Sequence, residues 1–300
     1  MSRKIPIILD TDIGGDIDDT WALAMLLRSP ELDVKLIVTG TGNTNYRAML
    51  IAKLLQIAGR TDIPIGLGLH QSDETGPQAE WLEEFTLADY PGQVHTDGVG
   101  ALIETVMSSP VPVTLLCIGP VPNIAAALER EPRLADRAKI VGMFGSVRVG
   151  YDESAQISDE YNVRIDAAAC RRMFEAFQEV TITPLDTCGL VRLTGEKYRR
   201  IRDSADPLVH AVIENYRIWA SHVTWESVDA EVGSSTLYDT VAVYLAFAQD
   251  LLEMEALGIR VTDEGYTILD ENAKPIRCAM RWKDLAAFED LLAARLLGVV

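Results

Sequence analysis

The sequence is poor in basic residues, with 27 Lys and Arg against 45 Asp and Glu and a formal net charge of −18. A chain with so little positive charge is a poor match for nucleic-acid phosphates or anionic lipid surfaces. No stretch reaches the roughly 20 consecutive apolar residues needed to span a bilayer. We therefore expect no nucleic-acid partner and no membrane, and the charge balance favours a neutral or cationic small molecule.

Cysteine is also scarce. The four cysteines lie far apart and form no CxxC pair: Cys117, Cys170, Cys188 and Cys278. This spacing predicts neither a zinc cluster nor a disulfide framework, and reduced thiols in a cytoplasmic protein are the simplest interpretation. The first apolar run stops at Asp10, which is too early for a signal peptide.

Short apolar runs alternate with helical patterns over the first two thirds of the chain. The runs that read as buried strands cover 5–9, 34–39, 63–68, 111–119, 139–145 and 179–186. Strands that alternate with helices form parallel sheets, so we predict an α/β fold. We expect a single domain, 1–300, with a mainly parallel, Rossmann-like central sheet flanked by helices.

Two later regions depart from this alternation. Beyond residue 195 the pattern is mostly helical, with a predicted hairpin over 259–280 and a last helix from Trp282. The polar segment 71–97 is longer than ordinary connections, so it is either a functional loop or lid, or a disordered insertion.

The stretch ILDTDIGGDIDD, residues 8–19, places five aspartates directly behind the first predicted strand: Asp10, Asp12, Asp16, Asp18 and Asp19. Open α/β sheets bind ligands at the carboxyl ends of their strands. A helix cap explains one or two of these aspartates, and carboxylates so close together repel unless some are protonated or a cation joins them. A divalent cation is therefore the economical explanation.

Two known acidic motifs fit this stretch poorly. An EF-hand loop counted from Asp10 fails, because Gly14 and Trp21 occupy positions that need acidic or amide ligands. A phosphatase of the haloacid dehalogenase type also begins with Asp-x-Asp after a strand and would use Asp10 as nucleophile with Mg²⁺. That alternative leaves the pair at 18–19 unexplained.

The stretch 8–27 resembles the N-terminal signature of the inosine-uridine preferring nucleoside hydrolase family, with two extra residues before its final aspartate pair. Further motifs follow in family order: TGTGN at 39–43, VHTDGVG at 94–100, LLCIGPVPNIAAALEREP at 115–132, EYNVRIDAAA at 160–169 and LYDTVAVYLA at 237–246. The resemblance covers most of the chain. It implies a nucleosidase that splits ribonucleosides into ribose and free base.

The resemblance also implies a Ca²⁺ ion and its ligands. Carried onto this chain, they are Asp12, Asp19, Asp239 and the backbone carbonyl of Ile118. Asp12 would also act as general base on a water that the ion polarises, and direct attack would invert the anomeric carbon. Taken alone, Asp239 reads equally well as a cap for the helix that follows it.

Further residues are implied at the sugar. Asp18 and Asn162 would bind the 2′ and 3′ hydroxyls, Glu160 the 5′ end and Asn43 another sugar edge, with Asp10 supporting the site from behind. Without the resemblance, Asn43 is a plain turn residue, and Glu160 and Asn162 belong to a solvated loop. Ser154 stands where the family often has asparagine near the 5′ hydroxyl, which leaves a modified 5′ group or an unusual base open.

The residues at the departing base are less settled. Tyr238 stands where many members have a histidine implicated in protonating the base, and tyrosine, with an unperturbed pKa of about 10, is the weaker acid. His95 matches a histidine of some pyrimidine-preferring members and is the first candidate acid, although a lone loop histidine is more often a surface residue. His222 and Trp225 would lie near the base, but with Tyr216 and Trp219 they also form a plausible packing stripe.

A third, non-catalytic interpretation is a ribose or nucleoside binding protein, motivated by the tyrosine at 238. The resemblance further implies a homodimer or homotetramer. Asp16, inside the two-residue extension of the motif, has no assignment.

Overall fold

Within residues 4–299, which the computed structural model describes, ten strands form one sheet in the order β4-β3-β2-β1-β5-β6-β7-β10-β8-β9. The strands are β1 Ile5–Thr11, β2 Leu32–Thr39, β3 Ile65–Leu67, β4 Val94–His95, β5 Val113–Cys117, β6 Ala138–Met143, β7 Val180–Thr183, β8 Leu252–Val261, β9 Thr267–Leu269 and β10 Pro275–Trp282. Neighbours from β4 to β10 pair in parallel, whereas β8 pairs antiparallel with both β10 and β9. The predicted single-domain, mainly parallel α/β fold is confirmed.

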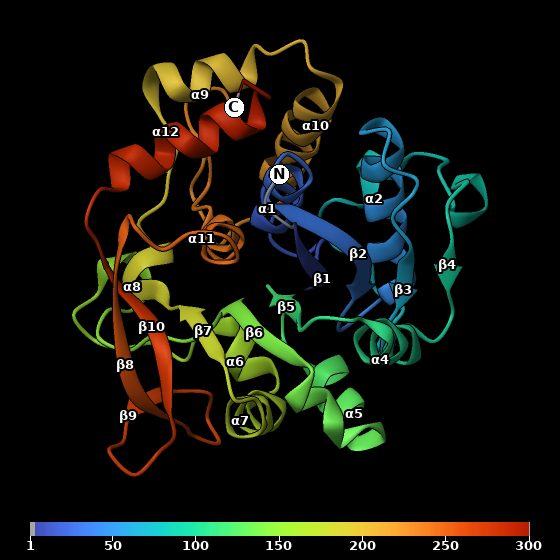
Figure 1. Cartoon of the computed structure of the whole chain (residues 1–300). Coiled ribbons are helices and arrows are strands. Elements are labelled where there is room, and N and C mark those ends of the chain that lie inside the picture. The colour runs from blue at the N-terminus through green and yellow to red at the C-terminus, as the bar shows by residue number, and fades with distance from the viewer. Residues whose placement is uncertain (1–3, 300) are drawn as a thin grey trace.

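Helices cover both faces of the sheet (Figure 1). They are α1 Asp18–Leu27, α2 Thr44–Ile57, α3 Ala79–Leu82, α4 Gly98–Ser108, α5 Pro122–Arg130, α6 Tyr161–Ile165, α7 Ala167–Ala176, α8 Leu185–Cys188, α9 Gly195–Arg202, α10 Pro207–His222, α11 Tyr238–Leu245 and α12 Leu285–Leu296. Side chains alternate across β1, so that Ile7 and Leu9 join the core beneath α1 and α10, and Ile8 joins the core beneath α4 and α5. Burial on both faces explains why the strands are apolar throughout.

The strand order reverses at the middle of the sheet. From β1 the chain builds outward through β2, β3 and β4, and it then returns to the other side of β1 as β5. Asp10 of β1 lies opposite Cys117 of β5 in the parallel register. The segments that follow these residues therefore leave the sheet side by side at a topological switch point, where open α/β sheets bind ligands.

The C-terminal region differs from the sequence-based expectation in two details. Trp282 ends β10 and does not begin a helix, which starts three residues later at Leu285. The predicted hairpin is the end of a larger unit, because β8 also pairs along most of its length with β10. The acidic and exposed positions in β8 hide the usual strand pattern, since this strand lies near the edge of the sheet.

The segment 71–97 is packed onto the molecule and is not a disordered insertion. Gln78 is fully buried, and its side-chain oxygen accepts hydrogen bonds from Thr20 (3.1 Å) and Asn215 (2.9 Å). Trp81 and Leu82 also join the core. The segment therefore covers the start of α1 and ties it to α10.

Three sequence-based expectations concern the whole chain. All four cysteines are free and buried. No helix among residues 4–299 combines the length and apolarity needed to cross a membrane. Residues 1–3 and 300 of the predicted domain lie outside the described residues.

Candidate active site

The aspartate motif leaves the sheet at the end of β1 and enters α1 through a tight turn. The Thr11 hydroxyl holds this turn, because it accepts a hydrogen bond from the backbone of Ile13 (3.1 Å) and donates one to Asp19. Gly14 has φ +106°, and a Cβ there would meet the Tyr46 ring at 2.6 Å. Only glycine fits this position, so the local sequence fixes the path that carries the aspartates.

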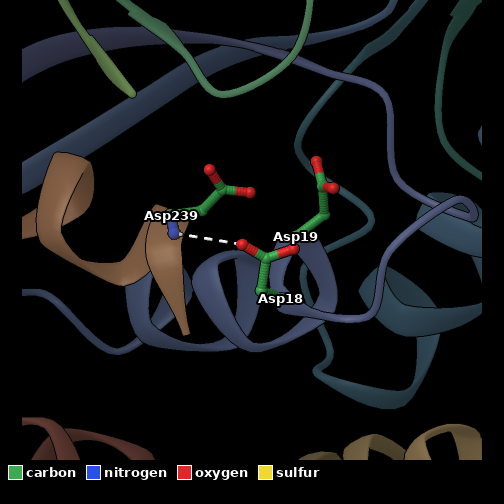
Figure 2. Close-up of side chains that lie close together, drawn as sticks. All are labelled: Asp18, Asp19 and Asp239. Atoms are coloured by element: carbon green, nitrogen blue, oxygen red, sulfur yellow. Dashed lines mark hydrogen bonds between the residues drawn. The ribbon is translucent and has the colours of Figure 1, made fainter. Parts of the chain in front are cut away.

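Three of the predicted residues meet in one buried cluster, formed by Asp18 and Asp19 of α1 and Asp239 of α11 (Figure 2). One carboxylate oxygen from each lies within 4.8 Å of the other two. Ca²⁺ binds oxygens at about 2.4 Å, so ligands on opposite sides of one ion are about 4.8 Å apart. The three carboxylates, here called the acidic cluster, could therefore hold a metal ion.

The electrostatics of the acidic cluster favour such an ion. Burial raises the pKa of Asp239 well above its usual range, and the neighbouring carboxylates, Asp18 first, raise it further. Burial and the nearby Asp12 do the same to Asp19. Carboxylates that repel one another in a buried site lose less free energy when a cation joins them than when they face each other alone. The donor set, oxygen only and strongly anionic, suits a hard divalent cation.

Asp12 lies beside the acidic cluster rather than within it. Its Oδ1 faces Gly119, where a Cβ would come within 2.5 Å of that oxygen. Its Oδ2 lies 3.9 Å from the Arg47 guanidinium. Burial raises the pKa of Asp12, and Arg47 opposes that rise. The sequence-based ligand set named Asp12 and assigned Asp18 to the sugar, whereas the closest group of three carboxylates contains Asp18.

Asp10 lies behind this arrangement, fully buried in β1. Its Oδ2 accepts a hydrogen bond from Asn123 (2.9 Å), and its Oδ1 has no partner among the described residues. Burial raises the pKa of Asp10 to about 7. Asn123 also donates to the carbonyl of Thr39 and accepts from the backbone of Leu69, so it ties together the carboxyl ends of β1, β2 and β3.

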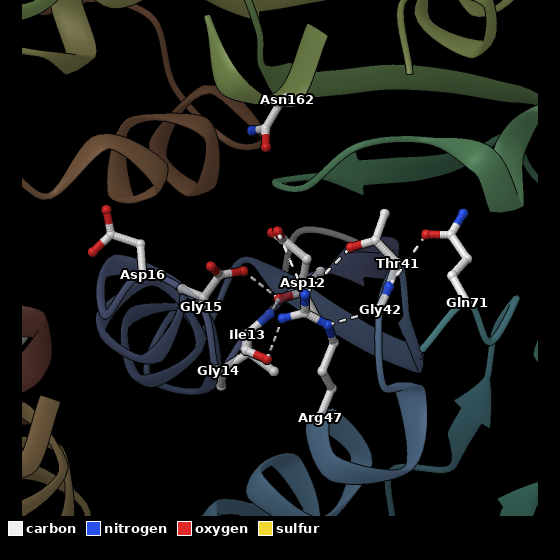
Figure 3. A network of polar contacts seen from close by, with 12 residues as sticks. Asp12, Ile13, Gly14, Gly15, Asp16, Thr41, Gly42, Arg47, Gln71 and Asn162 are labelled. Carbon is white, nitrogen blue, oxygen red and sulfur yellow. Dashed lines mark hydrogen bonds and ion pairs between the residues drawn. The ribbon is translucent and has the colours of Figure 1, made fainter. Parts of the chain in front are cut away.

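The opposite wall comes from the segments after β5 and β6. The side-chain nitrogen of Asn162 donates to the carbonyls of Ile118 (3.2 Å) and Met143 (3.1 Å). Its amide oxygen points toward Asp12 in Figure 3. Both N–H donors are thus occupied, and the oxygen is left to accept a hydrogen bond from a ligand.

Glu160 is buried and acts first as the N-cap of α6. Its carboxylate accepts hydrogen bonds from the backbone of Asn162 (2.7 Å), Val163 (3.2 Å) and Gly145 (2.9 Å). Burial raises its pKa to about 7, against the effect of these three bonds. Glu160 therefore orients Asn162, and neither residue belongs to a solvated loop.

Asn43 and Tyr238 both flank helix starts. Asn43 caps α2, since it accepts from the backbone of Tyr46 (3.0 Å), and its amide nitrogen donates to the carbonyl of Asp73 (3.0 Å). Tyr238 is the first residue of α11 and directly precedes Asp239. Burial raises the pKa of Tyr238 above its usual range, so this hydroxyl keeps its proton at neutral pH.

His95 lies apart from the residues described so far. It ends the two-residue strand β4, opposite Gly66 of β3, at the edge of the sheet. Strands β3 and β2 separate β4 from β1. The structure thus brings Tyr238 to the acidic cluster and leaves His95 on an edge strand.

The aromatic stripe of α10 divides as a packing stripe would. Tyr216 and Trp219 are fully buried, and the Trp219 indole donates to the carbonyl of Gly15 (3.1 Å). His222 is exposed and pairs with Glu80 (3.0 Å). Trp225 is 64% exposed and packs edge-on against Trp219, with ring centroids 6.1 Å apart. Half of the stripe is core, and the other half lies where a ligand could reach it.

Asp16 and two residues without sequence-based roles also contact the motif. The Asp16 carbonyl accepts from Gln78 (2.7 Å), and burial raises the pKa of its side chain to about 7, with the Glu226 carboxylate adding to the rise. Arg47 lies in the i, i+3, i+4 register of the buried residues Leu50 and Ile51 on α2. A cation on an apolar helical face was the signal that could have identified it.

The largest cavity lies elsewhere. It measures about 700 Å³ and is lined by residues of α7, β8 and the β8–β9 turn, none of which is a predicted site residue. Its charges already pair with each other, as Arg171 does with Asp263 at 2.6 Å. This mixed surface offers no chemistry comparable with the acidic cluster.

Comparison with known proteins identifies the family. The model of the family "Inosine-uridine preferring nucleoside hydrolase" matches residues 7–290. The chain belongs to this family. A curated relative, the pyrimidine-specific ribonucleoside hydrolase RihA of Escherichia fergusonii, is 27% identical over 97% of this chain and 98% of the relative.

Solved structures show the same fold. A plant nucleoside hydrolase, PpNRh1, superposes with a TM-score of 0.84 at 22% identity, covering 98% of this chain and 99% of that one. A purine-preferring ribonucleoside hydrolase from Gardnerella vaginalis gives 0.76 at 24% identity, with 98% of each chain covered.

Family membership makes this nucleoside hydrolase homologue an enzyme that acts on N-glycosyl bonds of ribonucleosides. The phosphatase alternative is wrong, and the complete burial of Asp10 agrees with that, since a nucleophile must reach its substrate. The non-catalytic binding alternative is set aside for the same reason of family.

Proposed function

We propose that the chain is a Ca²⁺-dependent nucleoside hydrolase that inverts the anomeric carbon. The observation that carries the proposal is the acidic cluster at the switch point of the sheet, with its oxygens within 4.8 Å and Asp12 at its side. In this proposal Asp19, Asp239 and the Ile118 carbonyl hold the ion, together with Asp12 or with Asp18. A bound cation would offset the charge of the cluster and lower the pKa of a water beside it.

The residues of the chain divide the remaining work. Asp12 accepts the proton of the attacking water, because Gly119 and Arg47 confine its carboxylate on two sides. Asp18 and the free amide oxygen of Asn162 accept the ribose 2′ and 3′ hydroxyls. Asn43 and Glu160 face other sugar edges, and Asp10 supports Asp12 from behind. A site that hydrogen-bonds these hydroxyls selects ribose over deoxyribose.

The base departs on the side of α10 and α11. We assign donation of a hydrogen bond to the leaving base to Tyr238, because it precedes Asp239 and keeps its proton at neutral pH. His222 and Trp225 would contact the base, and His95 remains the alternative acid. An assembly of two or four chains remains a prediction from the resemblance.

The test is a panel of purine and pyrimidine ribonucleosides followed by proton NMR. Both base classes are included because relatives carry names of both kinds. We expect free base in equal amount with ribose, and the α anomer of ribose first, since attack on a β-nucleoside from the opposite face inverts the centre. No base release from any member, or the β anomer first, would contradict the proposal.

Leaving-group activation gives a separate prediction. Replacing Tyr238 by phenylalanine should lower kcat on the best natural nucleoside by about 10-fold to 100-fold, since a donor to the developing negative charge is lost. The same variant should hydrolyse 4-nitrophenyl riboside within about 3-fold of the parent, because nitrophenolate needs no such donor. His95→Ala is the matched variant, and if it alone shows this contrast, the acid is His95.

A further inference from the structure

Arg47 of α2 carries a buried positive charge beside the aspartate motif. Its residue is 9% exposed, and it is the one cation named among the causes that shift Asp12 and Asp19. A buried guanidinium is costly unless its donors are satisfied and its charge is paired. The partners that satisfy Arg47 therefore indicate what the site gains from it.

The guanidinium bridges the two loops at the switch point (Figure 3). Its Nη1 donates to the carbonyl of Ile13 (2.8 Å), just past β1, and its Nε donates to the carbonyl of Thr41 (3.0 Å), just past β2. Only the planar fork of arginine reaches two carbonyls at once in this way. Arg47 therefore fixes the distance between the loop that carries Asp12 and the loop that leads to Asn43.

The backbone of the second loop needs such a clamp. Thr41 has φ +57°, a left-handed conformation that is unfavourable for a β-branched residue and costs on the order of 1–3 kcal/mol. Arg47 bonds both the carbonyl and, at 3.4 Å, the hydroxyl of Thr41. Strain of this kind persists where the surroundings enforce it, and here the enforcing group is the guanidinium.

The free edge of the guanidinium faces the proposed base. Nη2 lies 3.9 Å from Oδ2 of Asp12, beyond hydrogen-bond length but within ion-pair range, while Gly119 closes on Oδ1. The carboxylate of Asp12 is thus held between a backbone without a side chain and a fixed cation. Neither the acidic cluster nor Asn162 makes a contact of this kind with Arg47.

We infer that Arg47 is a positioning residue for hydrolysis: it clamps the loops after β1 and β2 and orients the Asp12 carboxylate for the attacking water. The inference rests on the proposed function. Because Arg47 acts through Asp12 and not on the nucleoside, its loss reduces kcat and leaves KM nearly unchanged. Because it opposes the charge of the acidic cluster, its loss does not weaken cation binding.

The test compares the variants Arg47→Ala and Arg47→Lys with the parent and with Arg295→Ala. Arg295 is a matched control, since it is equally buried and pairs with Glu31 at 2.6 Å, before β2 at the amino ends of the strands. We expect kcat of Arg47→Ala to fall by about 100-fold with KM within about 3-fold, as for a misplaced catalytic group. Added guanidinium chloride at millimolar level, but not ammonium chloride, should restore about 10-fold of that loss. Arg295→Ala should keep the parent's kcat.

Two further readouts separate positioning from general damage. Calorimetric titration of CaCl₂ into the metal-free proteins should give Arg47→Ala a Kd equal to or lower than that of the parent. Arg47→Lys keeps a charge but not the fork, so it should remain below the parent by about 10-fold or more in kcat, and it replaces the alanine variant if that one does not fold.

Several results would overturn the inference on a parent that releases base. These are an unchanged kcat in folded Arg47 variants, a rise in KM alone, no guanidinium rescue, or Ca²⁺ binding weakened by more than about 10-fold. A parent that releases no base from any nucleoside is instead the failure of the proposed function.

Discussion

Replacing Asp12 by asparagine should lower kcat by about 1,000-fold or more, because the carboxylate that accepts the proton of the attacking water is lost. Asparagine has the same shape, so contacts with Gly119 and Arg47 persist. The melting temperature should therefore stay within a few degrees of the parent. The measurement is the initial rate of base release from the best nucleoside, alongside a thermal scan.

A control on the far side of the molecule isolates this effect. Asp263 is exposed and pairs with Arg171 near the β8–β9 turn, so Asp263→Asn should retain full turnover. Near-parent hydrolysis by Asp12→Asn would remove the general base from the account. A loss of activity that merely follows a fall in melting temperature would do the same.

The metal-free protein should lose stability as pH rises from about 5 to about 8. Burial raises the pKa of Asp10, Asp16 and Glu160 to about 7 in the folded state, whereas the unfolded carboxyls ionise near pH 4. A raised folded pKa means that the native state binds more protons, so stability is full below about pH 4 and is lost as pH passes through 7. One group shifted by two units accounts for about 3 kcal/mol, or roughly 5 °C in melting temperature for a chain of this size.

Calcium should reverse this loss. At pH 8, millimolar CaCl₂ should raise the melting temperature of the parent, while NaCl of equal ionic strength should raise it far less. Asp239→Asn is the matched variant, because it removes one carboxylate of the acidic cluster. This variant should melt higher than the metal-free parent at pH 8 and respond little to CaCl₂. A parent indifferent to both pH and CaCl₂ would contradict a cation site.

The sheet could be predicted from sequence because its physics is local. Strands such as β5 and β6 are buried on both faces, so they read as unbroken apolar runs, and the helices between them enforce parallel pairing. The edge strands escaped prediction for the opposite reason. β4 has only two residues, and β8 carries exposed and acidic positions that resemble a loop.

The site was predictable as a set of residues but not as an arrangement. Crowded aspartates announced a cation, yet only the fold shows that Asp18, Asp19 and Asp239 share one cluster while Asp12 lies beside it. Likewise, Glu160 reads as a substrate ligand in a motif, whereas its carboxylate already caps α6. Arg47 reads as an ordinary helical charge until its two carbonyl partners, which come from distant segments, are known.

The central claim is that a divalent cation at the acidic cluster enables ribonucleoside hydrolysis. The most direct measurement is release of reducing sugar from the best ribonucleoside by the chelated protein, before and after CaCl₂ is restored. The account predicts a loss of at least about 1,000-fold on chelation and nearly full recovery with calcium in the parent, but not in Asp239→Asn. Turnover that survives complete removal of divalent metal would contradict it.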